Sequence, residues 1–155
     1  MAYSKEICQA ITDFLDSDGW HYELDEEREL IHFGVDIKGK LRSTKVYVDL
    51  RKDKYLVFST VSLKADEDCR AELRDLINRI NYGMIFGNFE MDDRDGEVRF
   101  RMAVDCENCI PNRNVIENSI VIPVLMVQRY GDALLAVMMG FASGADAYKA
   151  ADSDD

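Results

Sequence analysis

Residues 30–61 read LIHFGVDIKGKLRSTKVYVDLRKDKYLVFSTV, and apolar side chains occupy every second position through much of this stretch. The strict alternation at 31–37 and 46–50 predicts β-strands, because successive side chains of a strand point to opposite faces. A third strand is predicted over 55–61. The break at Lys38-Gly39-Lys40 has the composition of a turn and is short enough to join antiparallel neighbours. The stretch therefore predicts an antiparallel sheet.

The residues before this stretch predict one further strand and one helix. Aromatic or apolar residues alternate with polar ones over 20–24 and predict a strand, which the charged turn 25–28 separates from the next. Over residues 4–17 the apolar side chains recur at helical spacing instead. This apolar stripe comprises Ile7, Cys8, Ile11, Phe14 and Leu15. Ser4 is suited to cap the start of the helix, and Asp18-Gly19 to end it.

A second helix and a hairpin follow the four strands. The acidic run 66–68 precedes apolar residues at helical spacing that continue to Met84, and acids favour a helix N-terminus. Two strands are predicted over Ile85–Asp92 and Glu97–Cys106, because the Asp95-Gly96 pair between them is typical of a hairpin turn. Charged and apolar residues alternate in the second of these strands. One face of the sheet is therefore expected to contact water.

The C-terminal region is predicted to be helical as far as about Ser143, with an interruption or kink at Pro123 and at Gly131. Residues 145–155 are small and acidic and are expected to form a disordered tail. Residues 1–144 then make one α+β domain, an antiparallel sheet of five to six strands with helices on one face. The predicted element order is α-β-β-β-β-α-β-β-α.

The composition limits the possible partners. The chain has 155 residues, 47% of them hydrophobic and 32% charged, which is typical of a globular domain. Its 19 basic and 30 acidic residues give a net charge of -11, so binding to nucleic acid or to an anionic membrane surface is not expected. The first six residues contain no apolar run of the signal-peptide kind, and we expect a cytoplasmic protein with reduced cysteines.

Residues 78–101, NRINYGMIFGNFEMDDRDGEVRFR, resemble a motif of the YbjN-like family of bacterial sensory transduction regulators. The residues that carry the resemblance are Asn78, Asn81, Gly87, Phe89, Asp92, Asp95, Gly96, Val98 and Arg101. The element order over about residues 4–142 is also similar to that of type III secretion chaperones. The resemblance implies a chaperone-like α+β fold that is dimeric, and it supplies no catalytic residues.

Few residue patterns point to chemistry. Cys106 and Cys109 have C-x-x-C spacing, which fits a chance pair at a strand end, half of a metal site completed by another chain, or a redox dithiol. His21 and His32 lie in strand patterns and are expected on the polar face of the sheet. The acidic turns Asp25-Glu26-Glu27 and Asp92-Asp93 lack the spacing of a calcium loop and are interpreted as solvated turns. No nucleotide-binding glycine motif occurs in the sequence either. From these patterns together, no cofactor, metal or catalytic residue is predicted.

Two apolar runs near the C-terminus, IVIPVLMV at 120–127 and ALLAVMMGFA at 133–142, are the strongest remaining feature. Each run is too short to cross a membrane, and a span that joined them would place Arg129 and Asp132 inside the bilayer at a cost of about 2.5 to 3.5 kcal/mol each. A helix this apolar has to be covered on more than one side. It is therefore predicted to be core, a homodimer seam or a groove for another protein. The residues expected at a seam or groove are Leu125, Met126, Met138, Met139 and Phe141.

The function that these patterns favour is that of a non-enzymatic, protein-binding module with a chaperone-like or regulatory role, acting as a homodimer with a possible protein client. The alternative is a metal- or small-molecule-responsive regulator that uses Cys106 and Cys109.

Overall fold

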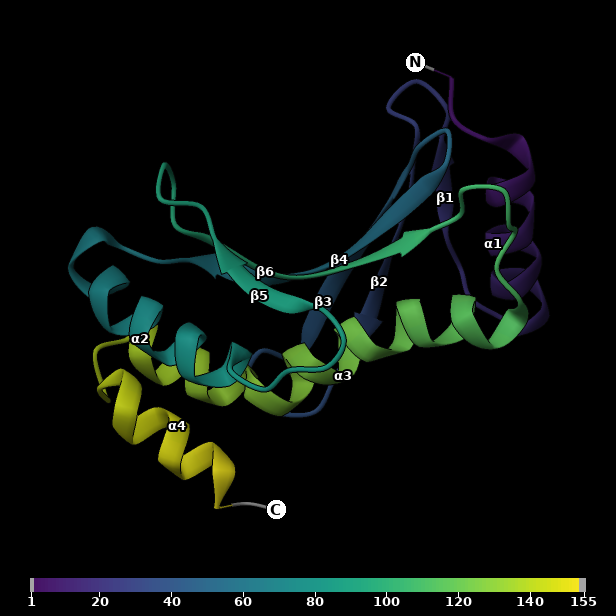
Figure 1. The fold of residues 1–155 in the computed structure, drawn as a ribbon. Helices are drawn as coiled ribbons and strands as arrows, with labels where there is room; N and C mark the ends of the chain where they lie inside the picture. The colour runs from purple at the N-terminus through teal and green to yellow at the C-terminus, as the bar shows by residue number, and fades with distance from the viewer. Residues whose placement is uncertain (1, 154–155) are drawn as a thin grey trace.

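The structure is a computed structural model, and it describes residues 2–153. A six-stranded antiparallel sheet with the strand order β1-β2-β3-β4-β6-β5 forms one layer, and four helices form the other (Figure 1). The strands are β1 Glu23–Asp25, β2 Leu30–Asp36, β3 Ser43–Leu50, β4 Lys54–Lys64, β5 Asn88–Met91 and β6 Glu97–Asp105. The helices are α1 Lys5–Ser17, α2 Arg70–Asn81, α3 Arg113–Met138 and α4 Gly144–Asp152, with a 3₁₀ turn, η1 Glu67–Cys69, before α2. The predicted α+β class, sheet and element order are confirmed.

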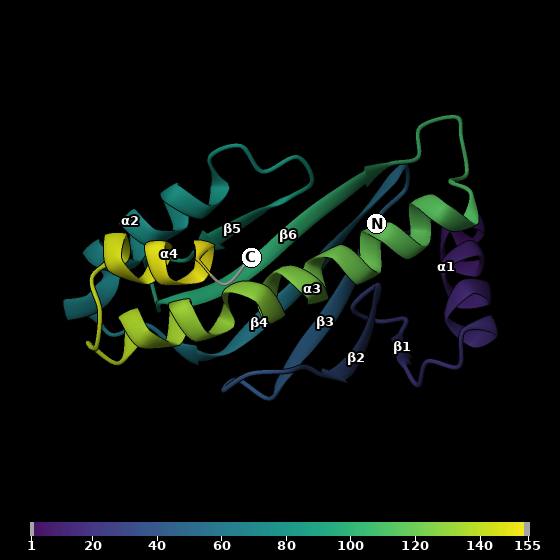
Figure 2. The same cartoon turned by 90° about the horizontal axis from the view of Figure 1, so that it is seen from below.

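The sheet is bowed, and its two faces differ. The helix α3 runs along one face beneath most of the strands, while no helix of residues 2–153 crosses the opposite face, called here the open face (Figure 1). Seen from the helical side, α1 lies at one end of α3, and α2 and α4 lie together near the other end (Figure 2). The water-facing side predicted from β6 is this open face, where Arg101 and Asp105 are exposed while Phe100 is fully buried on the other side.

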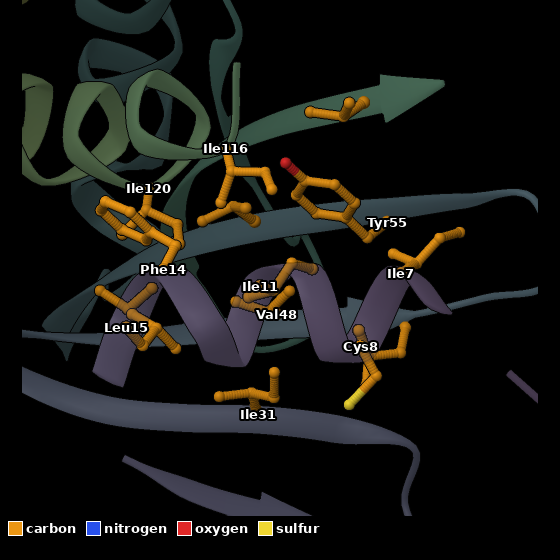
Figure 3. Close-up of a cluster of buried hydrophobic side chains, with 14 of the residues drawn as sticks. Ile7, Cys8, Ile11, Phe14, Leu15, Ile31, Val48, Tyr55, Ile116 and Ile120 are labelled. Carbon is orange, nitrogen blue, oxygen red and sulfur yellow. The ribbon is translucent and has the colours of Figure 1, made fainter. Parts of the chain in front are cut away.

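The core has two parts, and α3 contributes to both. One part joins α1 to β2, β3 and the first half of α3, and Figure 3 shows Ile11, Leu15 and Val48 among its side chains. The other joins α2, α4 and the second half of α3 to β5 and β6. Within the first part, the Tyr55 hydroxyl lies 2.7 Å from Ser119 Oγ, and this bond links β4 to α3. Burial raises the pKa of Tyr55 to about 12, so the hydroxyl stays protonated.

The helix α3 is continuous from Arg113 to Met138, so of the interruption or kink predicted at Pro123 and at Gly131, the interruption is wrong at both residues. Asn112 caps its start by accepting a hydrogen bond from the Val115 backbone, as expected for this residue type. Its length and composition would allow it to cross a membrane. In this structure, however, it packs on β4 and β6, and its residues Ile120, Val127 and Leu134 are fully buried.

The predicted disordered tail is also wrong where the structure describes it. Residues 144–152 form α4, which packs on α2 and α3, while residues 154–155 lie outside the described residues. Ser143 caps α4 by accepting a hydrogen bond from the Asp146 backbone, and Ala147 is buried against the other helices. A helix of small residues can approach its neighbours closely, so the same composition that suggested disorder permits this packing.

Candidate functional site

An exposed apolar patch lies where α3 ends. This helix-end patch comprises Met138, Met139 and Phe141; Phe141 is 82% exposed and Met139 56%, while Met138 is half-buried. Gly140 adopts a left-handed conformation that ends the helix, and the Phe141 amide then donates to the Ala136 carbonyl at 2.8 Å. The backbone of Phe141 is thus fixed at the helix end, and its ring is exposed to solvent.

The other two residues predicted at the seam lie apart from this patch. Leu125 is half exposed near the middle of α3, and Met126 is partly buried against the core. Leu125 and Met139 are 14 residues apart, which is about 21 Å along a helix. Between them, the side chains of Gln128 and Asp132 accept backbone hydrogen bonds from the loop that joins β2 to β3. The five residues therefore do not form one continuous apolar surface.

A second exposed apolar patch, which was not predicted from the sequence, lies between α2 and β5. This loop patch comprises Tyr82, Ile85 and Phe86 between α2 and β5, and Tyr82 and Ile85 are 91% and 85% exposed. The strand predicted from Ile85 begins only at Asn88, because Gly87 takes a left-handed conformation just before it. The signal for the loop was the Tyr82-Gly83 pair directly after the helix.

The residues of the family-like motif are structural. The Asn81 side chain both donates to the Phe89 carbonyl and accepts from its amide, at 2.9 Å each, so it joins the end of α2 to β5. A side chain at Gly87 would collide with the Phe100 ring, since a Cβ there would lie 2.5 Å from Cε1. Asn81 and Gly87 of the motif therefore determine how α2 packs with the β5–β6 hairpin.

The turn acids of this hairpin are held in ion pairs. Hydrogen bonds from Arg94 lower the pKa of Asp92 to about 2, and Arg74 lies 2.6 Å from Asp93. In the other acidic turn, Asp25 and Glu26 pair with Arg28 and Lys5. Among residues 2–153, no three or more His, Cys, Asp or Glu side chains are grouped so as to hold a metal ion.

The two cysteines with C-x-x-C spacing differ in their surroundings. Cys106 is buried at the end of β6, while Cys109 is exposed in the following loop. Burial, followed by the nearby Asp105 carboxylate, raises the pKa of Cys106 to about 11. Metal binding and thiol exchange both need the thiolate, so the environment of Cys106 opposes both.

This difference predicts selective alkylation. Treatment of the native protein with iodoacetamide at pH 8 should label Cys109 at least about ten times faster than Cys106, because the thiolate fraction falls tenfold per unit of pKa above the pH. The rates follow from peptide mass spectrometry over time, and labelling in urea serves as the control in which the two rates converge. Fast labelling of native Cys106 would contradict the structure and revive the metal and redox alternatives.

The two histidines are brought together at one end of the open face. His32 projects from β2 onto this face beside Tyr47 of β3, with ring centroids 6.2 Å apart, as predicted for the polar side of the strand. His21 lies just before β1, and both histidines line a pocket of about 520 Å³. Gly34 and Lys45, which face each other in the β2–β3 register, line it as well. Sequence analysis did not identify this pocket, although strand alternation already placed His32 and Gly34 on one face.

The comparisons with known proteins agree on one family. The model of the YbjN family, described as "Putative bacterial sensory transduction regulator", matches residues 8–136, which is more than half of the chain. Among solved structures, the chain is similar to that of "YbjN, a putative transcription regulator from E. coli", with a TM-score of 0.53 and 12% identity. The similarity covers 79% of this chain and 92% of that one, and at this identity it shows the fold. No match was found among curated proteins. The residues matched and the shared fold together show that this chain belongs to the YbjN family.

Proposed function

We propose that this chain is a regulatory protein without catalytic activity that acts by binding other proteins, and that it forms a homodimer through the helix-end patch. The observation that carries the proposal is the exposure of Phe141 and Met139 at a backbone position that hydrogen bonds hold in place. Burying one such phenylalanine gains about 1.5–3 kcal/mol, and a two-fold dimer buries it twice. The description of the family as regulators supports the proposed role.

Charge shapes this interface. A pocket of about 500 Å³ adjoins the patch and is lined by Met138 and Met139 on one side and by Asp66, Asp68 and Glu72 on the other. Two copies with a net charge of -11 repel each other, and added salt screens this repulsion. The proposed dimer should therefore tighten with ionic strength, whereas a partner that offers basic residues to these acids should be released by salt.

The oligomeric state tests the dimer. Sedimentation equilibrium at micromolar concentrations should give a dimer mass for the native chain, with a dissociation constant that falls as NaCl rises from 50 to 300 mM. The double variant Met139→Asp/Phe141→Asp should be monomeric, because the dimer would then bury two carboxylates per copy. Circular dichroism should show the same helix content for both proteins, since the substituted side chains are mostly exposed.

Two matched variants locate the interface. Ile110→Asp places one carboxylate on an exposed apolar residue before α3, at the opposite end of that helix, and should leave the dimer intact. Ile85→Asp/Phe86→Asp changes the loop patch and should also leave it intact. A monomeric native chain would refute the dimer. Loss of the dimer only in the loop variant would move the interface to the loop patch.

A further inference from the structure

We propose that the pocket on the open face binds a small planar anion of the aromatic carboxylate class. The shape of the pocket suits such a ligand. Gly34 lies in the pocket wall with an ordinary backbone conformation, and a Cβ built on it meets no atom within 4 Å. The missing side chain leaves a gap between Lys45 of the neighbouring strand and the rings of His32 and Tyr47. These two rings offer flat surfaces beside a space that accepts a ring.

The charge of the pocket also favours an anion. Lys45 and Arg28 line the pocket, together with the two histidines, against the single carboxylate of Glu23. Glu23 lies 3.4 Å from His32, and Arg28 lies near Asp25. Within residues 2–153, no carboxylate lies within ion-pairing distance of the Lys45 ammonium group, so Lys45 is the cation that is available to a ligand. A cationic pocket on a chain with a net charge of -11 favours an anion locally against the overall field.

The size of the pocket suits a small molecule. The pocket volume of about 520 Å³ falls in the range of sites for small molecules, about 300–1,000 Å³. A ligand of one or two fused rings with one carboxylate fits this volume. The ring would stack beside Tyr47 and His32, and the carboxylate would pair with Lys45. This binding is independent of the proposed dimer, because the pocket lies on the open face and the helix-end patch follows α3, on the other face.

The test uses 2-naphthoate as the probe, followed by ¹H–¹⁵N correlation spectra of the full chain in 150 mM NaCl. We expect saturable shifts of the Gly34, Lys45 and Tyr47 amide signals with a dissociation constant below about 1 mM. Naphthalene-2-methanol has the same ring without the charge, and cyclohexanecarboxylate has the charge without the plane. Both should bind at least about tenfold more weakly than 2-naphthoate, because each lacks one of the two interactions.

Variants separate the pocket from the rest of the surface. Gly34→Phe should fill the gap and abolish the shifts while its spectrum stays that of a folded protein, because the backbone there suits any residue and the space is open. Lys45→Gln should weaken binding at least about tenfold, while Lys52→Gln, an equal change of charge in an exposed turn, should leave it unchanged. Equal binding of the neutral alcohol, unaltered binding to Gly34→Phe, or shifts confined to other regions would each overturn the proposal.

Discussion

Replacing Phe100 with alanine should lower the free energy of unfolding by about 3–5 kcal/mol, the usual cost of removing a buried phenyl ring. The ring is fully buried in β6 and makes an edge contact with Phe89, with centroids 5.0 Å apart. Gly87 also lies directly against the ring and has no side chain that could move into the cavity. Urea unfolding followed by circular dichroism at 25 °C measures the change.

The matched control for this prediction is Phe58→Ala. Phe58 is paired with Arg101 of β6 but lies half-buried on the open face, where Arg99 covers its ring at 4.1 Å. Truncation of Phe58 to alanine removes less buried apolar surface than truncation of Phe100, and it leaves no closed cavity. It should cost less than half as much as Phe100→Ala. Equal costs would mean that the open face is covered in solution, and the assignment of the two faces would have to be revised.

The sequence predicted the elements whose signal is local. The alternation in β2 and β3, the Ser4 cap and the Asp95-Gly96 turn all lie where they were expected. These features depend on a few neighbouring residues, and tertiary contacts did not override them.

The errors arose where distant contacts decide the structure. The tail folds as α4 because Ala147 fits between α2 and α3, and the Ser143-x-x-Asp146 spacing was the overlooked sign of a helix start. An interruption or a kink was predicted at Pro123, and α3 continues through this residue without an interruption. Composition could not reveal either outcome without knowledge of the packing partner.

The candidate surfaces were predicted only in part. Apolar composition pointed to Met139 and Phe141, but it could not tell them from Met126, which packs on the core. The exposure of Ile85 was not predicted, because an apolar residue before a strand gives the same sequence pattern whether its side chain is buried or exposed. The pocket depends on the register that sets Gly34 opposite Lys45, which is a property of two strands together.

Gly96→Val, a change within the motif that marks the family, should strongly destabilise the fold. Gly96 has a φ of 80°, in the left-handed region, where a non-glycine residue costs about 1–3 kcal/mol. A Cβ there would also lie 2.1 Å from the Ala65 carbonyl oxygen, so the segment between β4 and α2 would have to move away. Overpacking of this kind adds about 1–3 kcal/mol, which gives a total of about 2–6 kcal/mol in the urea unfolding experiment.

Gly83→Val separates these two contributions. Gly83 has a nearly identical φ of 82°, but a Cβ there meets no atom within 4 Å. Its replacement should therefore carry only the backbone cost, and the difference between the two variants measures the close approach of the hairpin to Ala65. If Gly83→Val were as harmful as Gly96→Val, the backbone conformation alone would explain why glycine is needed at the hairpin. The Ala65 amide donates a hydrogen bond of 2.8 Å to the Gly96 carbonyl, which holds the Ala65 backbone close to Gly96. If Gly96→Val costs more, as expected, glycine is needed there because this backbone leaves no room for a side chain.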